Sequence, residues 1–194
     1  MAVPITRLPG ASRSGLSYGD LDGGWAMEWS PPNPQSVRAG LRLKAEQAWR
    51  EASDTARVVR LPGIYGPGRS AFERLASGRA RRIVKDGQVF SRAHVEDIAS
   101  GLHALIQSGK GGVYNLCDDL AAPPQDVISF AAALAGIDPP PGVRFEDADL
   151  SAMGRSFYAE CKRVSNARLK AVTGWRPAFP TYRDGLRAIF ADLR

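Results

Sequence analysis

The residues best suited to proton transfer stand close together, at His94, Glu96 and Asp97. The imidazole of a histidine titrates near neutral pH, and His94 directly follows a predicted strand, at the edge where open α/β sheets bind their ligands. Glu96 and Asp97 fall in the first turn of a predicted helix, where exposed backbone amides and the helix dipole favour carboxylates. Helix capping is therefore the leading interpretation of the acidic pair, and a helix-entry role is favoured over catalysis for His94.

Two glycine-containing loops are candidates for phosphate contacts, but neither has the spacing of a nucleotide-binding turn. A Gly-x-Gly-x-x-Gly turn lets the backbone approach a pyrophosphate and presents helix N-terminal amides to it. The motif Gly63-x-x-Gly66-x-Gly68 has the reverse spacing with a proline inside, and no Ser or Thr follows Lys110 in the second loop. Both are interpreted as structural turns.

Metal and thiol chemistry find no support in the sequence. Cys117 and Cys161 stand far apart without a Cys-x-x-Cys spacing, and the chain has two histidines that do not cluster. These residues cannot form a zinc or redox motif, so we expect no metal and predict that both cysteines are buried thiols.

The chain is basic, with 26 Lys and Arg against 20 Asp and Glu and a net charge of +6. Its densest basic cluster, Arg79, Arg81, Arg82 and Lys85, has no interleaved aromatic residues and no helix-turn-helix or RNA-recognition signature around it. We therefore expect no nucleic-acid partner, although a nucleic-acid binder stays open as an alternative. The cluster is either a solvated helix end or a surface that receives an anionic cofactor or substrate.

A globular protein without a membrane partner is expected from the length and composition. The chain has 194 residues, of which 44% are hydrophobic and 24% charged, and this is ordinary globular usage. No apolar run approaches the roughly 18 residues that a membrane span needs, and the N-terminal stretch lacks the apolar centre of a secretion signal. A cytoplasmic location is expected, with an organelle transit peptide in the first 19 residues as the less favoured alternative.

Strands alternate with helices along the chain, a pattern typical of an α/β architecture with a largely parallel sheet. The helix at 37–52 is predicted to be amphipathic, with Val37, Leu41, Ala45 and Ala48 or Trp49 on its apolar face. Further helices are predicted at 71–82, 94–109, 123–136, 165–172 and 181–193, and strands at 86–90, 113–117 and 143–147. A short β-branched strand is also predicted at the start of the segment 56–70, before its Gly/Pro-rich turn. From about residue 138 the predicted elements are a short strand, a loop and two helices, and this part of the chain resembles a smaller appended lobe.

Several motifs occur in an order that resembles one known family. They are Tyr18-Gly19-Asp20, Ala45-Glu46, the loop Arg60-Leu61-Pro62-Gly63-Ile64-Tyr65-Gly66-Pro67-Gly68, the segment His94-Val95-Glu96-Asp97-Ile98-Ala99, Val113-Tyr114-Asn115-Leu116, Ser165-Asn166-Ala167-Arg168-Leu169 and Gly174-Trp175-x-Pro177. Together they resemble the NAD-dependent epimerase/dehydratase family, the extended short-chain dehydrogenases/reductases. The resemblance covers nearly the whole chain from about residue 14, and it is to the C-terminal two-thirds of such a protein.

This resemblance implies a truncated Rossmann-like, doubly wound parallel sheet with a small C-terminal substrate lobe. Residues 1–137 would form a partial NAD(P)-binding domain without the Gly-rich first units, and residues 138–194 the lobe, interleaved with 66–95. The implied cofactor is NAD or NADP, bordered at its nicotinamide end by Leu61, Pro62, Gly63 and Ile64. The implied partner is a small-molecule substrate, with Phe90, Arg92 and His94 in the wall of its cleft. A homodimer is left open.

The chain departs from the family at the catalytic positions. Alignment on Ala45-Glu46 places Arg38 and Arg42 where the family has its catalytic Tyr-x-x-x-Lys. The tyrosine normally exchanges a proton with the substrate, whereas arginine stays protonated and instead binds anions through a bidentate fork. The catalytic residues are therefore unknown, and an exposed helix face is the favoured interpretation of both arginines.

Two further positions differ from the family pattern. The usual Ser or Thr falls on Gly15, with Ser14 and Ser17 as imperfect substitutes, and Phe90 replaces an arginine that often meets a nucleotide-sugar diphosphate. Arg92 could compensate for that arginine. We favour an atypical NAD(P)-dependent oxidoreductase or epimerase, with an inactive truncated remnant or cofactor-binding module as the alternative. An unrelated α/β fold is the remaining possibility.

Overall fold

The computed structural model describes residues 17–193 as an α/β protein. Its helices are α1 (Val37–Ala52), α2 (Ala71–Ala76), α3 (Val95–Ser108), α4 (Pro124–Ala135), α5 (Ala152–Phe157), α6 (Ala167–Thr173) and α7 (Tyr182–Asp192). Its strands are β1 (Trp25–Ala26), β2 (Arg57–Arg60), β3 (Gly63–Tyr65), β4 (Arg82–Val84), β5 (Arg92–His94), β6 (Gly112–Asn115), β7 (Gly142–Arg144) and β8 (Arg163–Val164). The predicted alternation of helices and strands is confirmed.

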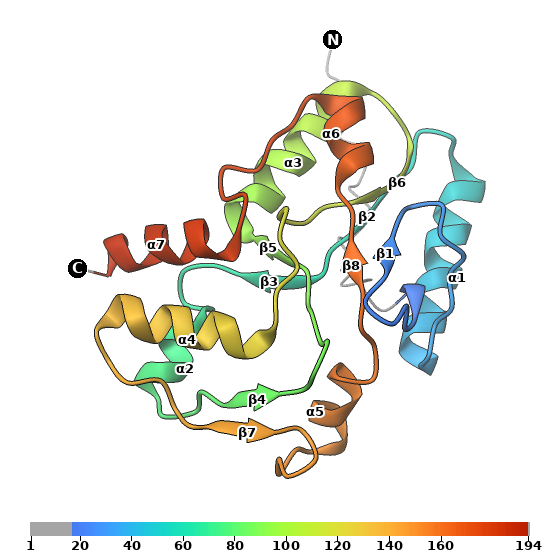
Figure 1. Ribbon diagram of the computed structural model, residues 1–194. Helices are drawn as coiled ribbons and strands as arrows, with labels where there is room; N and C mark the ends of the chain where they lie inside the picture. The colour runs from blue at the N-terminus through green and yellow to red at the C-terminus, as the bar shows by residue number, and fades with distance from the viewer. Residues whose placement is uncertain (1–16, 194) are drawn as a thin grey trace.

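Each of these strands pairs with one partner, and all four pairs are parallel, as the alternating pattern predicts. The longest pair joins β2 to β6, with Arg57 opposite Gly112 and Arg60 opposite Asn115. The others join β3 to β5, β1 to β8 and β4 to β7. Figure 1 shows the β4–β7 pair at the opposite end of the molecule from β2 and β6.

Helix ends follow the chemistry of their terminal residues. His94 is the N-cap of α3, and Gly109 ends that helix in the left-handed conformation, with φ at 67°. The αL region carries little steric cost for glycine, which explains why the helix stops there. In α4, Pro124 stands at the first helical position and Gly136 follows the last, which is the usual asymmetry of helix ends.

Three of the predicted elements are wrong in extent, one of them the strand predicted at 143–147, because β7 ends at Arg144. Residues 86–90 do not form a strand; they contain a turn, and only Phe90 makes an isolated bridge, to Ala122. The strands flank this turn, because β4 ends at Val84 and β5 begins at Arg92. The helix predicted over 71–82 is also shorter, since α2 ends at Ala76 and Gly78 adopts a positive φ of 66° directly after it.

The core is divided into clusters that follow these elements. One cluster packs α2, α4 and α7 together through Phe72, Ile128 and Leu186. A second joins the β2–β6 pair to α3 and α6, with Leu105, Leu116 and Leu169 fully enclosed. Figure 1 shows α4, α2 and α7 on one side of the molecule and α1 on the other.

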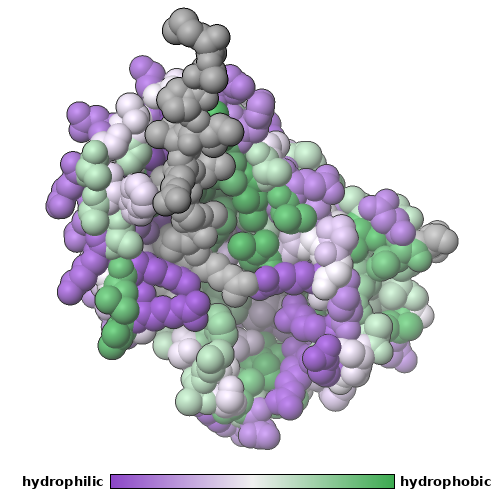
Figure 2. All heavy atoms as spheres, turned by 180° about the vertical axis from the view of Figure 1, so that it is seen from behind, coloured by the Kyte–Doolittle hydropathy of each residue, from purple (hydrophilic) through white to green (hydrophobic). Residues whose placement is uncertain are grey.

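The packing face of α1 is not the apolar face expected from the sequence. Val37 is 84% exposed, Leu41 62% and Trp49 48%, whereas Ala39 and Glu46 are buried. The helix therefore packs through a small residue and a carboxylate, and its apolar residues face outward. Figure 2 shows the molecule from behind, where exposed apolar side chains lie between hydrophilic ones over much of the surface.

Within residues 17–193, none of the helices has the length and apolar character needed to cross a membrane.

Candidate functional site

The segment Leu61–Ile64 lies where two parallel strand pairs meet. It follows the carboxyl end of β2 directly and runs into β3, and the Gly63 amide donates to the carbonyl of Ser91 at 3.3 Å. Leu61 is buried, Pro62 and Ile64 are half-buried, and Gly63 is exposed. Carboxyl ends of parallel strands are the usual ligand-binding edge of open α/β sheets. The structure thus brings the four residues together at an edge with partial access to solvent.

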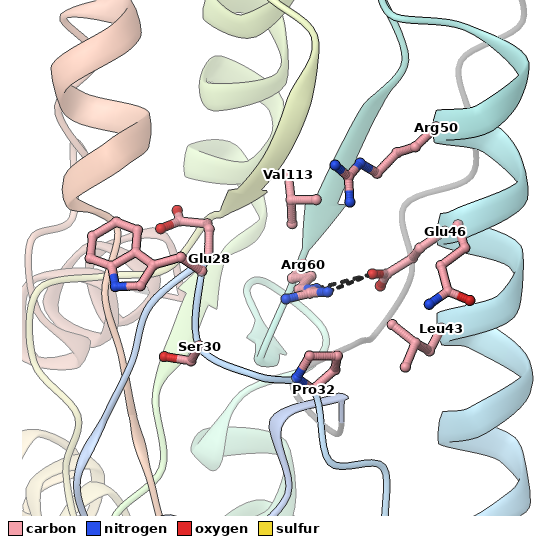
Figure 3. Close-up of a pocket in the computed structure, with 10 residues that line it drawn as sticks. Glu28, Ser30, Pro32, Leu43, Glu46, Arg50, Arg60 and Val113 are labelled. Atoms are coloured by element: carbon pink, nitrogen blue, oxygen red, sulfur yellow. Dashed lines mark hydrogen bonds and ion pairs between the residues drawn. The ribbon is translucent and has the colours of Figure 1, made fainter.

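A cavity of about 160 Å³ opens beside this edge, between α1 and the carboxyl end of β2. Its walls come from α1, from the loop between Glu28 and Pro32, and from Arg60 and Val113 (Figure 3). Arg60 immediately precedes Leu61, so the cavity and the Leu61–Ile64 segment are neighbours in the chain. Sequence reasoning did not identify this cavity, because its wall combines segments that are distant in the sequence.

An ion pair between Glu46 and Arg60 crosses one side of the cavity. Arg60 donates from Nη2 to Glu46 Oε2 at 2.8 Å and from Nε to the same oxygen at 3.1 Å. Both side chains are 6% exposed, and the dashed line in Figure 3 marks their contact. Glu46 Oε1 and Arg60 Nη1 have no hydrogen-bond partner in the described part of the chain. The pair is therefore buried but only partly satisfied.

Glu28 and Tyr18 extend this polar group on the strand side. Glu28 accepts from the backbone amide of Asn115 at 2.9 Å, and the Tyr18 hydroxyl donates to Asn115 Oδ1 at 2.7 Å. The Arg60 guanidinium lies 4.7 Å from the centre of the Tyr18 ring. Burial raises the pKa of both the Glu28 carboxyl and the Tyr18 hydroxyl. These contacts hold the carboxyl ends of β2 and β6 to the segments before and after β1.

Arg38 and Arg42 lie on α1, one turn apart. Arg38 is exposed and Arg42 is half-buried. Glu46, four residues after Arg42, turns its buried carboxylate to Arg60. A guanidinium at either position can hold an anion but cannot exchange a proton near neutral pH.

His94 is enclosed by aromatic rings. Its side chain is 1% exposed, with ring centroids 5.1 Å from Tyr65 and 4.1 Å from Phe179. Its Nδ1 accepts from the Glu96 amide at 3.3 Å, so the neutral ring carries its proton on Nε2. Burial lowers the pKa of this imidazole. The geometry matches the helix-entry role favoured from the sequence.

Asp97 has a role that the sequence did not indicate. Its two carboxylate oxygens accept from the amides of Ala178 and Phe179, at 2.6 and 3.1 Å. It therefore ties the start of α3 to the segment before α7 rather than capping its own helix. Burial raises the pKa of Asp97, and the two amide bonds oppose that shift.

Phe90 and Arg92 contact each other, and His94 follows Arg92 two residues further along β5. Arg92 donates from Nη1 to the carbonyls of Phe90 and Ala122, at 2.7 and 3.1 Å. The Phe90 ring lies 5.7 Å from that of Tyr158, in the loop after α5. Of the three predicted substrate residues, Phe90 and Arg92 are in contact, and His94 packs against Tyr65 and Phe179.

Neither a disulfide nor a metal site is formed by the described residues. Both cysteines are free; Cys117 is buried as predicted, but Cys161 is half-buried and not the enclosed thiol expected. Over residues 17–193, no group of three or more His, Cys, Asp or Glu side chains has the arrangement to hold a metal ion. Gly15 and Ser14, two positions where the chain departs from the family, lie outside the described residues.

The chain is similar to several known proteins. No protein-family model matches it. It is 28% identical to 3-diazoavenalumate denitrifying reductase from a Streptomyces species, over 85% of this chain and 54% of that protein. A functionally unknown conserved protein from Silicibacter pomeroyi is 50% identical, with a TM-score of 0.86, over 93% of this chain and 64% of that one. RMD from Pseudomonas aeruginosa, solved with NADPH, is 25% identical, with a TM-score of 0.69, over 92% of this chain and 64% of that one.

The similarity is thus partial in length but extends over most of this chain. The chain spans about half of the reductase and 64% of each of the two solved structures. The parallel strands, the Leu61–Ile64 segment and the order of elements accompany the similarity in sequence. In sequence and fold the chain resembles the C-terminal two-thirds of NAD-dependent epimerase/dehydratase proteins, the extended short-chain dehydrogenases/reductases.

Proposed function

We propose that this chain is an atypical NAD(P)-dependent oxidoreductase or epimerase-like protein that acts on a small molecule without a Tyr-x-x-x-Lys pair. The observation that carries the proposal is the position of Leu61–Ile64 at the carboxyl end of β2, in a fold shared with RMD, which was solved with NADPH. In this proposal the part up to residue 137 carries the cofactor. Residues 138–194, interleaved with 66–95, carry the substrate.

The residues at this edge fit the nicotinamide end of a dinucleotide. Gly63 is exposed, and a Cβ added there would come no nearer than 3.5 Å to another residue, so there is room above its backbone. Next to the segment, Glu46 Oε1 and Arg60 Nη1 are a buried acceptor and a buried donor without hydrogen-bond partners among residues 17–193. A carboxamide both donates and accepts hydrogen bonds, which suits such a pair. A bound nicotinamide would supply the hydride transfer, while the protein binds and orients it.

The sequence does not provide the usual site for the other end of the cofactor. It contains no Gly-x-Gly-x-x-Gly turn, whose backbone amides would hold the pyrophosphate. Arg38 and Arg42 take the positions of the family's tyrosine and lysine, and a guanidinium stays charged near neutral pH. Proton transfer would therefore have to come from another group or from water.

The alternative is a cofactor-binding module without turnover. The two arginines favour it, because they remove the proton donor and leave only the capacity to bind an anion. The same Leu61–Ile64 segment would then bind a dinucleotide without a chemical step.

A hydride-transfer assay separates these functions. NADPH or NADH is incubated with the protein and a panel of small aldehydes and ketones, and the loss of reduced-nicotinamide absorbance is followed. Saturable, protein-dependent oxidation supports the oxidoreductase. Binding of the cofactor without oxidation supports the module, and neither binding nor oxidation by folded protein contradicts both.

A further inference from the structure

The cavity between α1 and β2 has three buried polar atoms in its wall that lack a hydrogen-bond partner among residues 17–193. They are Glu28 Oε2, Glu46 Oε1 and Arg60 Nη1. Each of these three residues is more than nine-tenths buried. Because a buried polar atom without a partner costs free energy, such atoms are usually satisfied by a bound molecule or by ordered water. Three of them in one wall indicate a polar binding site.

Strand pairing and hydrogen bonds bring these three side chains together. Arg60 lies opposite Asn115 in the parallel pair β2–β6, and the backbone amide of Asn115 donates to Glu28 Oε1 at 2.9 Å. Paired strands are about 4.8 Å apart, so the Glu28 carboxylate lies beside the strand position of Arg60. Arg60 also donates to Glu46 Oε2 at 2.8 Å, and Figure 3 shows it between the two glutamates. Two carboxylates therefore flank one guanidinium.

The numbers of donors and acceptors favour one chemical group. Two carboxylate oxygens accept hydrogen bonds and one guanidinium N–H donates, so the matching group is uncharged and offers two donors and one acceptor. A primary carboxamide has this combination in its NH₂ and carbonyl groups. A carboxylate has no donor and would meet two like charges, and an amidinium has no acceptor and would meet the charge of Arg60. An alcohol has one donor and would leave one oxygen without a partner.

The rest of the wall suits a flat apolar group attached to this amide. Pro32, Leu43 and Val113 line the cavity beside the polar side chains. Trp29 belongs to the same wall and is largely exposed, so its indole is accessible for stacking on a ring. The cavity of about 160 Å³ has room for on the order of five waters of about 30 Å³ each. One small ring with its amide group takes up a similar space.

We propose that this cavity binds the primary carboxamide of a small aromatic amide, with Glu28 and Glu46 accepting from its NH₂ group and Arg60 donating to its carbonyl. Glu28 thereby selects an amide over an acid. The amide has two sources, the nicotinamide end of a dinucleotide or a separate small molecule. Only the first source rests on the proposed function, because the cavity offers the same donors and acceptors to either.

The test is a titration of the full chain with benzamide at pH 8, followed by ligand-observed NMR. Burial raises the pKa of Glu28, and a pH above neutral favours its ionised, accepting form. Saturable binding is expected at about millimolar strength, which is typical of so small a ligand. Benzoate lacks both donors, and N,N-dimethylbenzamide keeps the carbonyl but loses both N–H groups. Each should bind at least about tenfold more weakly than benzamide.

Glu28→Gln tests the acceptor directly. The glutamine keeps an oxygen for the Asn115 amide but replaces Oε2 by an NH₂ group, so benzamide should bind about tenfold more weakly. The matched control is Glu146→Gln, which makes the same change at an exposed position after β7, at the opposite end of the molecule. It should leave the affinity unchanged. Circular dichroism verifies the fold of both variants, and the comparison of the three ligands on the parent protein decides if Glu28→Gln does not fold.

Three results would overturn the proposal. They are no saturable benzamide binding by folded protein, as for a cavity filled by water alone; benzoate or N,N-dimethylbenzamide binding as tightly as benzamide; or equal benzamide affinities of the parent and a folded Glu28→Gln.

A competition experiment separates the two sources of the amide. Loss of benzamide binding in the presence of NADPH or NADH identifies the nicotinamide end of the cofactor, whereas an unchanged affinity identifies a separate small amide, and both results support the site. The binding of each cofactor is also measured alone. Benzamide binding without cofactor binding would contradict the proposed function and leave the amide site, and cofactor binding without benzamide binding would do the reverse.

Discussion

Glu46 in the middle of α1 and Arg60 at the last position of β2 form an ion pair at 2.8 Å in which each side chain is 6% exposed. The pair anchors the helix to the strand at the edge where the proposed cofactor binds, and the residues of α1 that the sequence marked as apolar stay outside. The attachment of α1 therefore depends on charge and hydrogen bonding more than on apolar burial.

Removing one partner of this pair should strongly destabilise the protein. Glu46→Ala leaves the Arg60 charge buried without its carboxylate, a change that costs about 3–5 kcal/mol in buried pairs. Urea unfolding followed by circular dichroism measures the free energy of unfolding. Glu51→Ala, which removes an exposed carboxylate from the same helix, is the control and should stay within about 0.5 kcal/mol of the parent. Similar effects of the two variants would show that the ion pair does not hold α1.

Two glycines within helices should respond oppositely to alanine. A Cβ at Gly40 in α1 would meet nothing within 4 Å, so Gly40→Ala should raise the free energy of unfolding by about 0.5–1 kcal/mol. A Cβ at Gly101 in α3 would lie 2.6 Å from the enclosed Leu116 side chain. Gly101→Ala should therefore destabilise the protein by about 1–3 kcal/mol. Chemical denaturation of both variants checks this, and a stabilising Gly101→Ala would show that the α3 packing is looser than described.

The contribution of Asp118 to the free energy of unfolding should fall as the pH rises from 5 to 8. Burial raises the pKa of Asp118 to about 8, so the folded state keeps a proton that the unfolded chain has already lost. Wherever the folded state binds more protons, stability decreases with pH, here by at most about 1.4 kcal/mol per pH unit. Asp118→Asn should flatten this dependence. Urea midpoints at several pH values measure it, and parallel curves for parent and variant would exclude Asp118 as the cause.

Blocking the space above Gly63 should weaken cofactor binding. Gly63→Leu places a branched side chain over the exposed backbone of the proposed nicotinamide site, and we expect at least a tenfold loss of NADPH affinity, about 1.4 kcal/mol. Gly63→Ala is the matched control, because its Cβ would make only an ordinary contact at 3.5 Å with the Ser91 carbonyl. Equal affinities of parent and Gly63→Leu, with the fold verified, would place the cofactor elsewhere.

The sequence predicted elements well where local chemistry decides them. The ends of α3 and α4 follow from His94, Gly109, Pro124 and Gly136, whose effects on the backbone are local. The prediction of a strand at 86–90 was wrong because Gly87, at φ 73°, forms a turn. The apolar residues that follow Gly87 gave no indication of this turn.

The site was less predictable, because its contacts join distant parts of the chain. The spacing around Glu46 gave no sign that its carboxylate would meet Arg60, fourteen positions away. Asp97 was expected to cap a helix, but it binds amides 81 and 82 positions further on. The prediction that the apolar face of α1 packs against the core was wrong for the same reason. Periodicity identifies an apolar face, but tertiary packing decides whether other elements cover that face.

The central claim is that this chain binds a nicotinamide dinucleotide at the Leu61–Ile64 edge, and calorimetric titration with NADPH and then NADH tests it most directly. The sample is the 194-residue protein, shown to be intact by mass and folded by circular dichroism. The account predicts saturable binding of at least one of the two cofactors at micromolar strength. The absence of any binding heat for either cofactor, from a folded sample, would contradict it.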